Sequence, residues 1–118
     1  MITREFTVGD RAVSLRADLY RPDGSIVVLG ITETVTFRMV SLAGVVEIAN
    51  KAATIVSRGS AATNTPAQVR YDWAAADVDT AGTYAGWFIR TDASALTEHF
   101  PHQDHADPEF EIIFRADT

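Results

Sequence analysis

The stretch from Tyr71 to Phe88 (YDWAAADVDTAGTYAGWF) places the tightest constraint on how this chain can fold. Two segments in which apolar and polar side chains alternate flank a corner of small and polar residues, Ala74–Gly82. Alternation with a period of two is typical of a β-strand with one buried face. Asp77 and Gly82 precede Tyr84, which matches a tyrosine corner, where a Tyr hydroxyl bonds to backbone a few residues upstream. Asp77, Gly82 and Tyr84 are therefore predicted to form the structural corner of a Greek-key β-sandwich.

The rest of the chain repeats this alternation in short segments that are separated by turn residues. No segment of ten residues shows a convincing helical period, and short strands at a spacing of 8–12 residues favour an all-β sandwich. The predicted strands are Thr3–Val8, Val13–Tyr20, Ile26–Leu29, Glu33–Ser41, Val45–Ile48, Ala52–Ser57, Gln68–Trp73, Gly82–Thr91 and Glu109–Arg115, with a turn at Asn50-Lys51 and polar loops at Gly59–Ala67 and His99–Pro108.

An immunoglobulin-type arrangement puts the strand Tyr84–Arg90 in the middle of one sheet, with Glu33–Ser41 and Glu109–Arg115 as neighbours. Antibody domains carry a Cys two residues after the corner Tyr. This chain has no Cys, and Gly86 stands at that position. Phe37 is the candidate for the place of the usual core Trp. We predict a single domain over residues 1–118, an Ig-like antiparallel β-sandwich with Greek-key topology.

Composition and charge exclude several classes of partner. The formal net charge is −6, the isoelectric point is about 4.8, and the basic residues are scattered singly. Nucleic acid is not expected as a partner, because binding a duplex requires a clustered basic surface. The first ten residues lack the apolar segment of a signal peptide, and the longest apolar runs are too short to cross a bilayer. We expect a soluble protein, made in the cytosol, with no membrane insertion.

Several short motifs, taken in order, resemble a family of phage proteins. They are the L-x-R-P-D-G hairpin of Leu19–Gly24, the V-T-F-R-M strand of Val35–Met39, the segment Val69–Tyr84 that leads into G-T-Y-A-G-W-F, and a closing F-P followed by E-F-E-I-I-F. The ordered set resembles the Ig-like N-terminal domain of phage baseplate upper proteins and related small virion proteins.

The resemblance implies a non-enzymatic protein of a bacteriophage virion, synthesised in the host cytoplasm. Its partners would be other virion proteins, in a homo- or hetero-oligomeric assembly, and possible contact with the host surface is part of the same expectation. Baseplate upper proteins continue into a stalk and further domains. This sequence has only 118 residues. Because of this difference in length, a minor tail protein, a head–tail connector or a capsid-decorating protein is an equal alternative to a baseplate component. The family implies no cofactor.

One group of residues has the spacing of a metal site. His99, His102 and His105 are three residues apart and are interleaved with Asp104 and Asp107. Imidazole and carboxylate ligands suit Zn²⁺, Ni²⁺ or Mn²⁺. The competing interpretation is a polar loop between strands, and it is favoured because no ligand distant in sequence completes the set. The same loop is also a candidate for contact with a partner or receptor.

Catalysis is not expected. Acid–base chemistry requires paired carboxylates in a cleft, whereas Asp77 and Asp79 stand in a corner where such side chains normally bond to turn backbone. The chain has no G-x-S-x-G motif and no Gly-rich phosphate loop.

Alternation also predicts an apolar surface. With Tyr84 facing the core, Trp87 and Ile89 face outward, and on the neighbouring strands Val40 and Ile113 do the same. If the three strands adjoin, these four residues form a patch for a partner, since Trp is a common interface anchor. The alternative is that the N-terminal segment or a long loop covers the patch.

A different function class is a module that binds a host-surface glycan through its end loops, Asn64–Ala67 and His99–Asp107. Such a module needs an exposed aromatic platform in a loop. Phe100 is the one aromatic residue in these segments.

Overall fold

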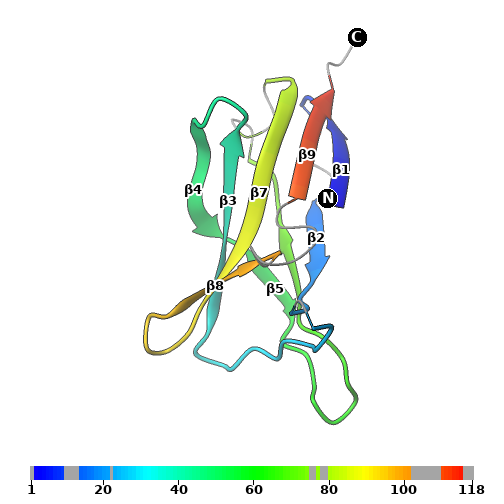
Figure 1. The fold of residues 1–118 in the computed structure, drawn as a ribbon, viewed down its shortest axis with the longest axis vertical. Coiled ribbons are helices and arrows are strands. Elements are labelled where there is room, and N and C mark those ends of the chain that lie inside the picture. Colours follow the sequence, from blue (N-terminus) through cyan, green and yellow to red (C-terminus); the bar gives the residue numbers. More distant parts are fainter. Residues whose placement is uncertain are drawn as a thin grey trace.

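The computed structural model describes residues 2–9, 14–21, 23–74, 77, 80–101 and 110–115 of the 118-residue chain. The strands in this part of the chain form two sheets that share one hydrophobic core (Figure 1). They are β1 (Ile2–Thr7), β2 (Leu15–Asp18), β3 (Thr34–Ser41), β4 (Val46–Ala52), β5 (Thr54–Ser57), β6 (Gln68–Tyr71), β7 (Gly82–Thr91), β8 (Thr97–Phe100) and β9 (Phe110–Arg115).

The larger sheet has the strand order β1-β9-β7-β3-β4, and β8 pairs with the second half of β7, beyond β9. The smaller sheet has the order β2-β6-β5. The chain passes between the sheets after β1, β2, β4 and β6, which gives the predicted Greek-key, Ig-like β-sandwich. As predicted, β7 lies between β3 and β9. The pair β1–β9 is parallel, so the larger sheet is mixed rather than purely antiparallel.

The predicted turn at Asn50-Lys51 is wrong. Strand β4 continues through these residues to Ala52, and the chain then crosses to the smaller sheet and enters β5. Ala49 and Asn50 together oppose Arg38 of β3, and Asn50 has a φ of 51°. Asn tolerates this left-handed conformation, so a signal that suggests a turn instead produces a β-bulge inside a strand.

Two further segments differ from the prediction. The start of the predicted loop His99–Pro108 belongs to strand β8, which forms a hairpin with β7 and buries Phe100. The predicted strand Ile26–Leu29 is not a strand: Ile26 forms a single bridge with Tyr20, and Val27 and Leu29 form backbone hydrogen bonds with Ala67 and Arg58. Residues 102–109 lie outside the described part of the chain.

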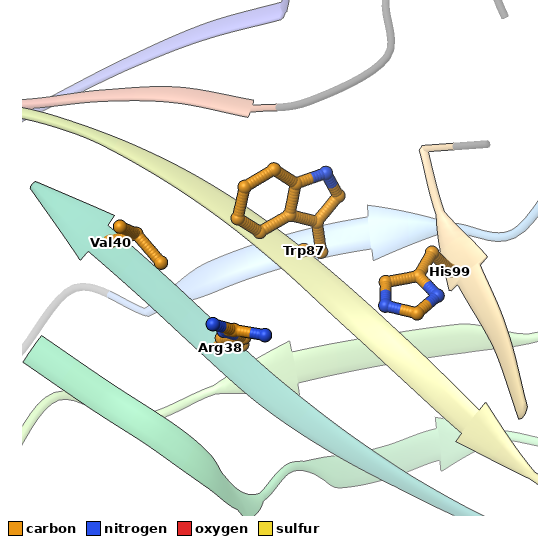
Figure 2. A pocket seen from close by; sticks show the side chains of 4 residues that line it. All are labelled: Arg38, Val40, Trp87 and His99. Atoms are coloured by element: carbon orange, nitrogen blue, oxygen red, sulfur yellow. The ribbon is translucent and has the colours of Figure 1, made fainter. Parts of the chain in front are cut away.

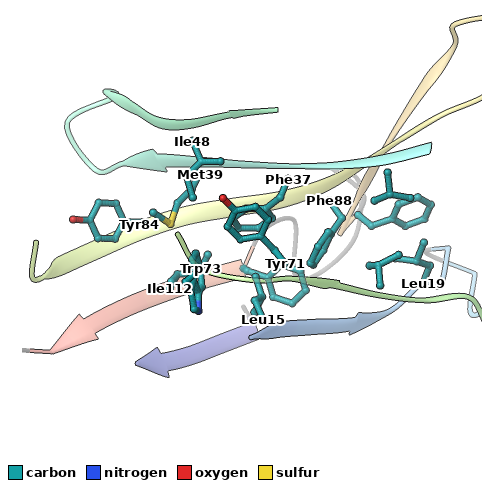
Figure 3. Close-up of a cluster of buried hydrophobic side chains, with 14 of the residues drawn as sticks. Leu15, Leu19, Phe37, Met39, Ile48, Tyr71, Trp73, Tyr84, Phe88 and Ile112 are labelled. Carbon is teal, nitrogen blue, oxygen red and sulfur yellow. The ribbon is translucent and has the colours of Figure 1, made fainter. Parts of the chain in front are cut away.

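The centre of the core is aromatic (Figure 3). Phe37 of β3 is fully buried and stacks on Tyr71 of β6, with the ring centroids 4.7 Å apart. Trp73, just after β6, meets the ring of Phe37 edge-on at 5.9 Å and that of Phe114 edge-on at 5.1 Å. Stacked and edge-to-face pairs are the favoured aromatic geometries. The rings thus pack residues of β3 and β9 in the larger sheet against residues of β6 and the segment after it in the smaller sheet.

Gly86 lies where the side chains of Ile112 and Phe37 leave no room for a Cβ atom. A Cβ atom at this position would lie 2.6 Å from the Ile112 Cδ1 atom and 3.0 Å from the Phe37 Cζ atom. Both distances are shorter than ordinary van der Waals contact. Aromatic and aliphatic packing therefore occupies the place where antibody domains carry a Cys side chain.

The predicted tyrosine corner is present before β7. The Tyr84 hydroxyl donates a hydrogen bond to the backbone carbonyl of Thr80 at 3.0 Å. Gly82 has a φ of 156°, and a Cβ atom there would lie 3.5 Å from the Tyr84 hydroxyl. The Tyr side chain thus covers the turn and fixes the start of β7, the strand that carries Trp87.

Asp77 is the buried polar residue of the corner, with 8% of its surface exposed. Its carboxylate accepts hydrogen bonds from the Tyr71 hydroxyl at 2.7 Å and the Ala74 backbone N–H at 2.8 Å. The Lys51 Nζ atom lies 3.5 Å from the other carboxylate oxygen. Because Lys51 belongs to β4, the carboxylate ties the larger sheet to the segment that leaves the smaller one. Asp79 lies outside the described residues.

This arrangement predicts that the stability of the fold depends on pH in the alkaline range. Burial, together with the hydrogen bond to Asp77, raises the pKa of Tyr71. A raised folded-state pKa means that the stabilisation is complete below the unfolded pKa of about 10 and is lost as the pH rises through the folded value. We expect the free energy of unfolding, measured with urea, to decrease above about pH 10. In Tyr71→Phe, which has no hydroxyl to ionise at this position, we expect the free energy of unfolding to decrease less steeply with pH. Tyr20→Phe, at an exposed Tyr, is the control. An equal pH slope in Tyr71→Phe and the wild type would contradict the assignment.

Candidate partner interface

The outer faces of the two sheets differ in character. Residues that pair across strands lie on the same face of a sheet, so the strand registers define the composition of each face. The smaller sheet presents a polar outer face, and the larger sheet presents one with apolar residues at its centre. The outward residues of the smaller sheet include Arg16, Asp18, Gln68 and Arg70.

The apolar centre of the larger face is built from β3, β4 and β7. Trp87 of β7 is half-buried and pairs with Arg38 of β3. The next outward residue of β7, Ala85, pairs with Val40, which pairs in turn with Val46 of β4. These residues follow the alternation of their strands, because every second residue of β3 and β7 is buried in the core. We call the outward surface of β1, β9, β7, β3, β4 and β8 the outer face.

A hollow of about 270 Å³ lies in this face (Figure 2). It is lined by Arg38 and Val40 from β3, Trp87 from β7 and His99 from β8. The indole ring and the Val40 side chain supply apolar walls, and the guanidinium and imidazole groups supply hydrogen-bond donors. The hollow is thus suited to a side chain that carries a polar or anionic end on an apolar stem.

The four predicted interface residues are not all together. Val40 and Trp87 both line the hollow. Ile89 is the next outward residue of β7 and does not belong to the core cluster between the sheets. Because it is only 6% exposed, it offers a partner little surface area. Ile113 pairs with Thr83, two rows away from Trp87 along β7. Of the predicted patch, Val40 and Trp87 therefore lie together at the hollow, Ile89 is covered, and Ile113 lies apart from them near the corner.

Exposed apolar residues continue beyond Val40 to the tip of the β3–β4 hairpin. Leu42 is 78% exposed and Val45 is 57% exposed, and Val46 beside them is also exposed. Gly44 forms the turn with a φ of 86°. One edge of the outer face is therefore apolar from the hollow to the hairpin tip.

Arg38 and Glu111 on the outer face have no ion pair inside the described part of the chain. Arg38 meets no carboxylate there, and Glu111 only accepts a hydrogen bond from the Thr3 hydroxyl at 3.1 Å. By contrast, Glu5 and Arg115 on the same face pair with each other. One cation and one anion on this face thus have no charged partner among the described residues.

The metal hypothesis is only partly covered by the structure. His99 is half-buried on β8, where it pairs with Ile89. His102, His105 and the acidic residues between them lie outside the described residues. Within the described ranges, no three His, Cys, Asp or Glu side chains are close enough to hold a metal ion. In the same ranges, no helix has the length and hydrophobicity needed to span a bilayer.

Sequence reasoning missed three residues of this site. Arg38 shares the outward parity of Val40 on β3, and that signal was available in the alternation. Val46 lies two residues from the buried Ile48, and it faces outward only because a bulge in β4 separates the two residues, which the alternation does not indicate. His99 could not be placed at the hollow, because the sequence of β8 suggests a polar loop. Its position depends on the hairpin that β8 forms with β7.

Comparisons with protein-family models, with curated proteins and with solved structures find no significant match to this chain. What the site can do is therefore argued from its own geometry.

Proposed function

We propose that this protein is a structural or attachment protein of a bacteriophage virion, of the tail, baseplate or head, and that it acts through protein–protein contacts rather than catalysis. The observation that carries the proposal is the half-buried Trp87, which lines a hollow on the outer face together with Val40. A half-buried Trp beside a hollow is a common interface anchor, and a partly apolar outer face on a small domain favours a partner there. The ordered motifs that resemble phage virion proteins supply the virion context.

The second function class, glycan binding through the end loops, is not favoured by the described residues. Phe100, the aromatic residue that such a loop would present, is 3% exposed and packs in the core from β8. The outer face offers a half-buried Trp that lines a hollow together with Val40 and Arg38, and Trp and Arg are enriched in protein interfaces.

Replacing Trp87 with Ser is expected to weaken binding to a virion partner by at least about 30-fold, because loss of a central anchor costs roughly 2 kcal/mol or more. The purified chain is mixed with each tail, baseplate and capsid protein encoded beside its gene. Complexes are detected by size-exclusion chromatography with light scattering, and their affinity is measured by calorimetry.

Leu96→Ser is the matched control. Leu96 is a large exposed apolar residue in the β7–β8 turn and does not line the hollow. Its replacement is expected to leave binding within about threefold of the wild type, as is usual for contacts outside an interface centre. A virion partner that binds wild type and Trp87→Ser equally would exclude this face. The absence of any virion partner would refute the proposed function.

A further inference from the structure

We propose that the outer face is self-complementary and that a second copy of the chain is one of its partners, with Glu111 of each copy entering the hollow beside Arg38 of the other. This inference deepens the proposed function, because it uses the same face and names an occupant for its hollow.

The two charges lie on opposite sides of β7. Arg38 on β3 pairs with Trp87, and Glu111 on β9 pairs with Ala85, the next outward residue of β7. Two strand spacings and one row separate their backbone positions, which is about 12 Å. Both side chains are attached to the same rigid sheet and have no ion pair among the described residues. A second copy of the chain can supply the opposite charge that each does not meet among the described residues.

In a dimer with a twofold axis, the Arg38–Glu111 pair between copies forms twice. In a twofold symmetric interface, residue i of one copy contacts residue j of the other, and j contacts i. An axis that runs within the interface, between the Arg38 and Glu111 positions, exchanges the two charges between facing copies. Ala85 lies between them and is small enough to allow close approach. The Trp87 rings of the two copies then flank the axis at the centre of the contact.

The hollow fits a Glu side chain. The guanidinium of Arg38 presents a planar pair of donors that a carboxylate can accept from both oxygens. Trp87 and Val40 form apolar walls for the methylene groups and exclude water from the charge pair, and His99 closes one side. The volume of about 270 Å³ leaves room for this side chain without displacing a strand.

The face is also large enough. Five neighbouring strands, each six to ten residues long, form it. At about 4.8 Å between strands and 3.3 Å per residue, its projected area is roughly 600 Å². The accessible surface of such a face exceeds its projection, which brings it close to the roughly 800 Å² per partner of a stable interface.

A charge-exchange experiment tests this inference. The masses of wild type, Arg38→Glu, Glu111→Arg and the double variant are measured by light scattering and sedimentation equilibrium over a wide range of protein concentration. The wild type is expected to dimerise. Each single variant is expected to dimerise at least about 30-fold more weakly, because it opposes like charges at two symmetric positions. The double variant restores both pairs and is expected to return to within about tenfold of the wild type.

Arg16→Glu is the matched control, since it makes the same charge change on the outer face of the smaller sheet and is expected to leave dimerisation unchanged. Thermal unfolding of every variant confirms that loss of the dimer is not loss of the fold. A monomeric wild type, single variants that dimerise normally, or a double variant without rescue would each overturn the inference. A monomer that still binds a virion protein through Trp87 would overturn this inference alone and leave the proposed function standing.

Discussion

Replacing Phe37 with Ala is expected to lower the free energy of unfolding by about 3–5 kcal/mol, the largest effect of any single substitution considered. Phe37 is fully buried, and its ring contacts three others. The centroid distances are 4.7 Å to Tyr71, 5.1 Å to Phe88 and 5.9 Å to Trp73. Truncation removes these contacts and leaves a cavity that the two rigid sheets cannot close. Urea unfolding, followed by the fluorescence of the Trp residues and by circular dichroism, measures the loss.

Phe37→Leu distinguishes cavity formation from loss of aromatic contact. Leu fills most of the space and is expected to cost only about half as much as Ala. Val56→Ala, at an exposed position of β5, is expected to change the unfolding free energy by less than about 0.5 kcal/mol. If Phe37→Ala were as stable as Val56→Ala, the aromatic cluster would not be the centre of the core.

Replacing Asp77 with Ala is the second large effect, with an expected loss of roughly 2–4 kcal/mol. The carboxylate accepts hydrogen bonds from the Tyr71 hydroxyl and the Ala74 N–H, and it faces Lys51 of β4. Without it, the Tyr71 hydroxyl is left buried without this acceptor, which costs more than the hydrogen bond itself contributed. Lys51 is half exposed and recovers much of its hydration, so the ion pair contributes the smaller part.

Asp72→Ala is a matched control five residues away. Asp72 also pairs with a cation, Arg70, at 3.1 Å, but its side chain is exposed. Surface ion pairs contribute little, and the expected change is below about 1 kcal/mol. Asp77→Asn keeps the shape and an acceptor oxygen for Tyr71, and we expect an intermediate loss. Equal effects of Asp77→Ala and Asp72→Ala in urea unfolding would show that the buried carboxylate does not connect the corner to the core.

Much of the fold could be predicted from local patterns. The alternation of Val35, Phe37 and Met39 correctly gave the buried face of β3, and the predicted strand Gly82–Thr91 has the bounds of β7. The tyrosine corner was also correct, because its hydrogen bond joins Tyr84 to Thr80, only four residues away. Interactions that close within one turn leave a local signature in the sequence.

Less of the candidate site could be predicted. The outward direction of Trp87 and Val40 follows from alternation, but the covering of Ile89 by its neighbours and the distance of Ile113 do not. Glu111 was not recognised, because a lone charge on a strand is ordinary. It became significant only when the strand registers placed it across β7 from Arg38.

The amino-acid sequence by itself determined most of the strands, the side chains that β3 buries and the corner that begins β7. The tertiary structure alone decided that β4 continues through Asn50, that β8 brings His99 to the hollow, and that Lys51 meets Asp77. The reason is physical. A period of two specifies which side of a strand is buried, but it carries no information about which strand lies alongside or in which register. That choice is made by the packing of side chains that are far apart in the chain.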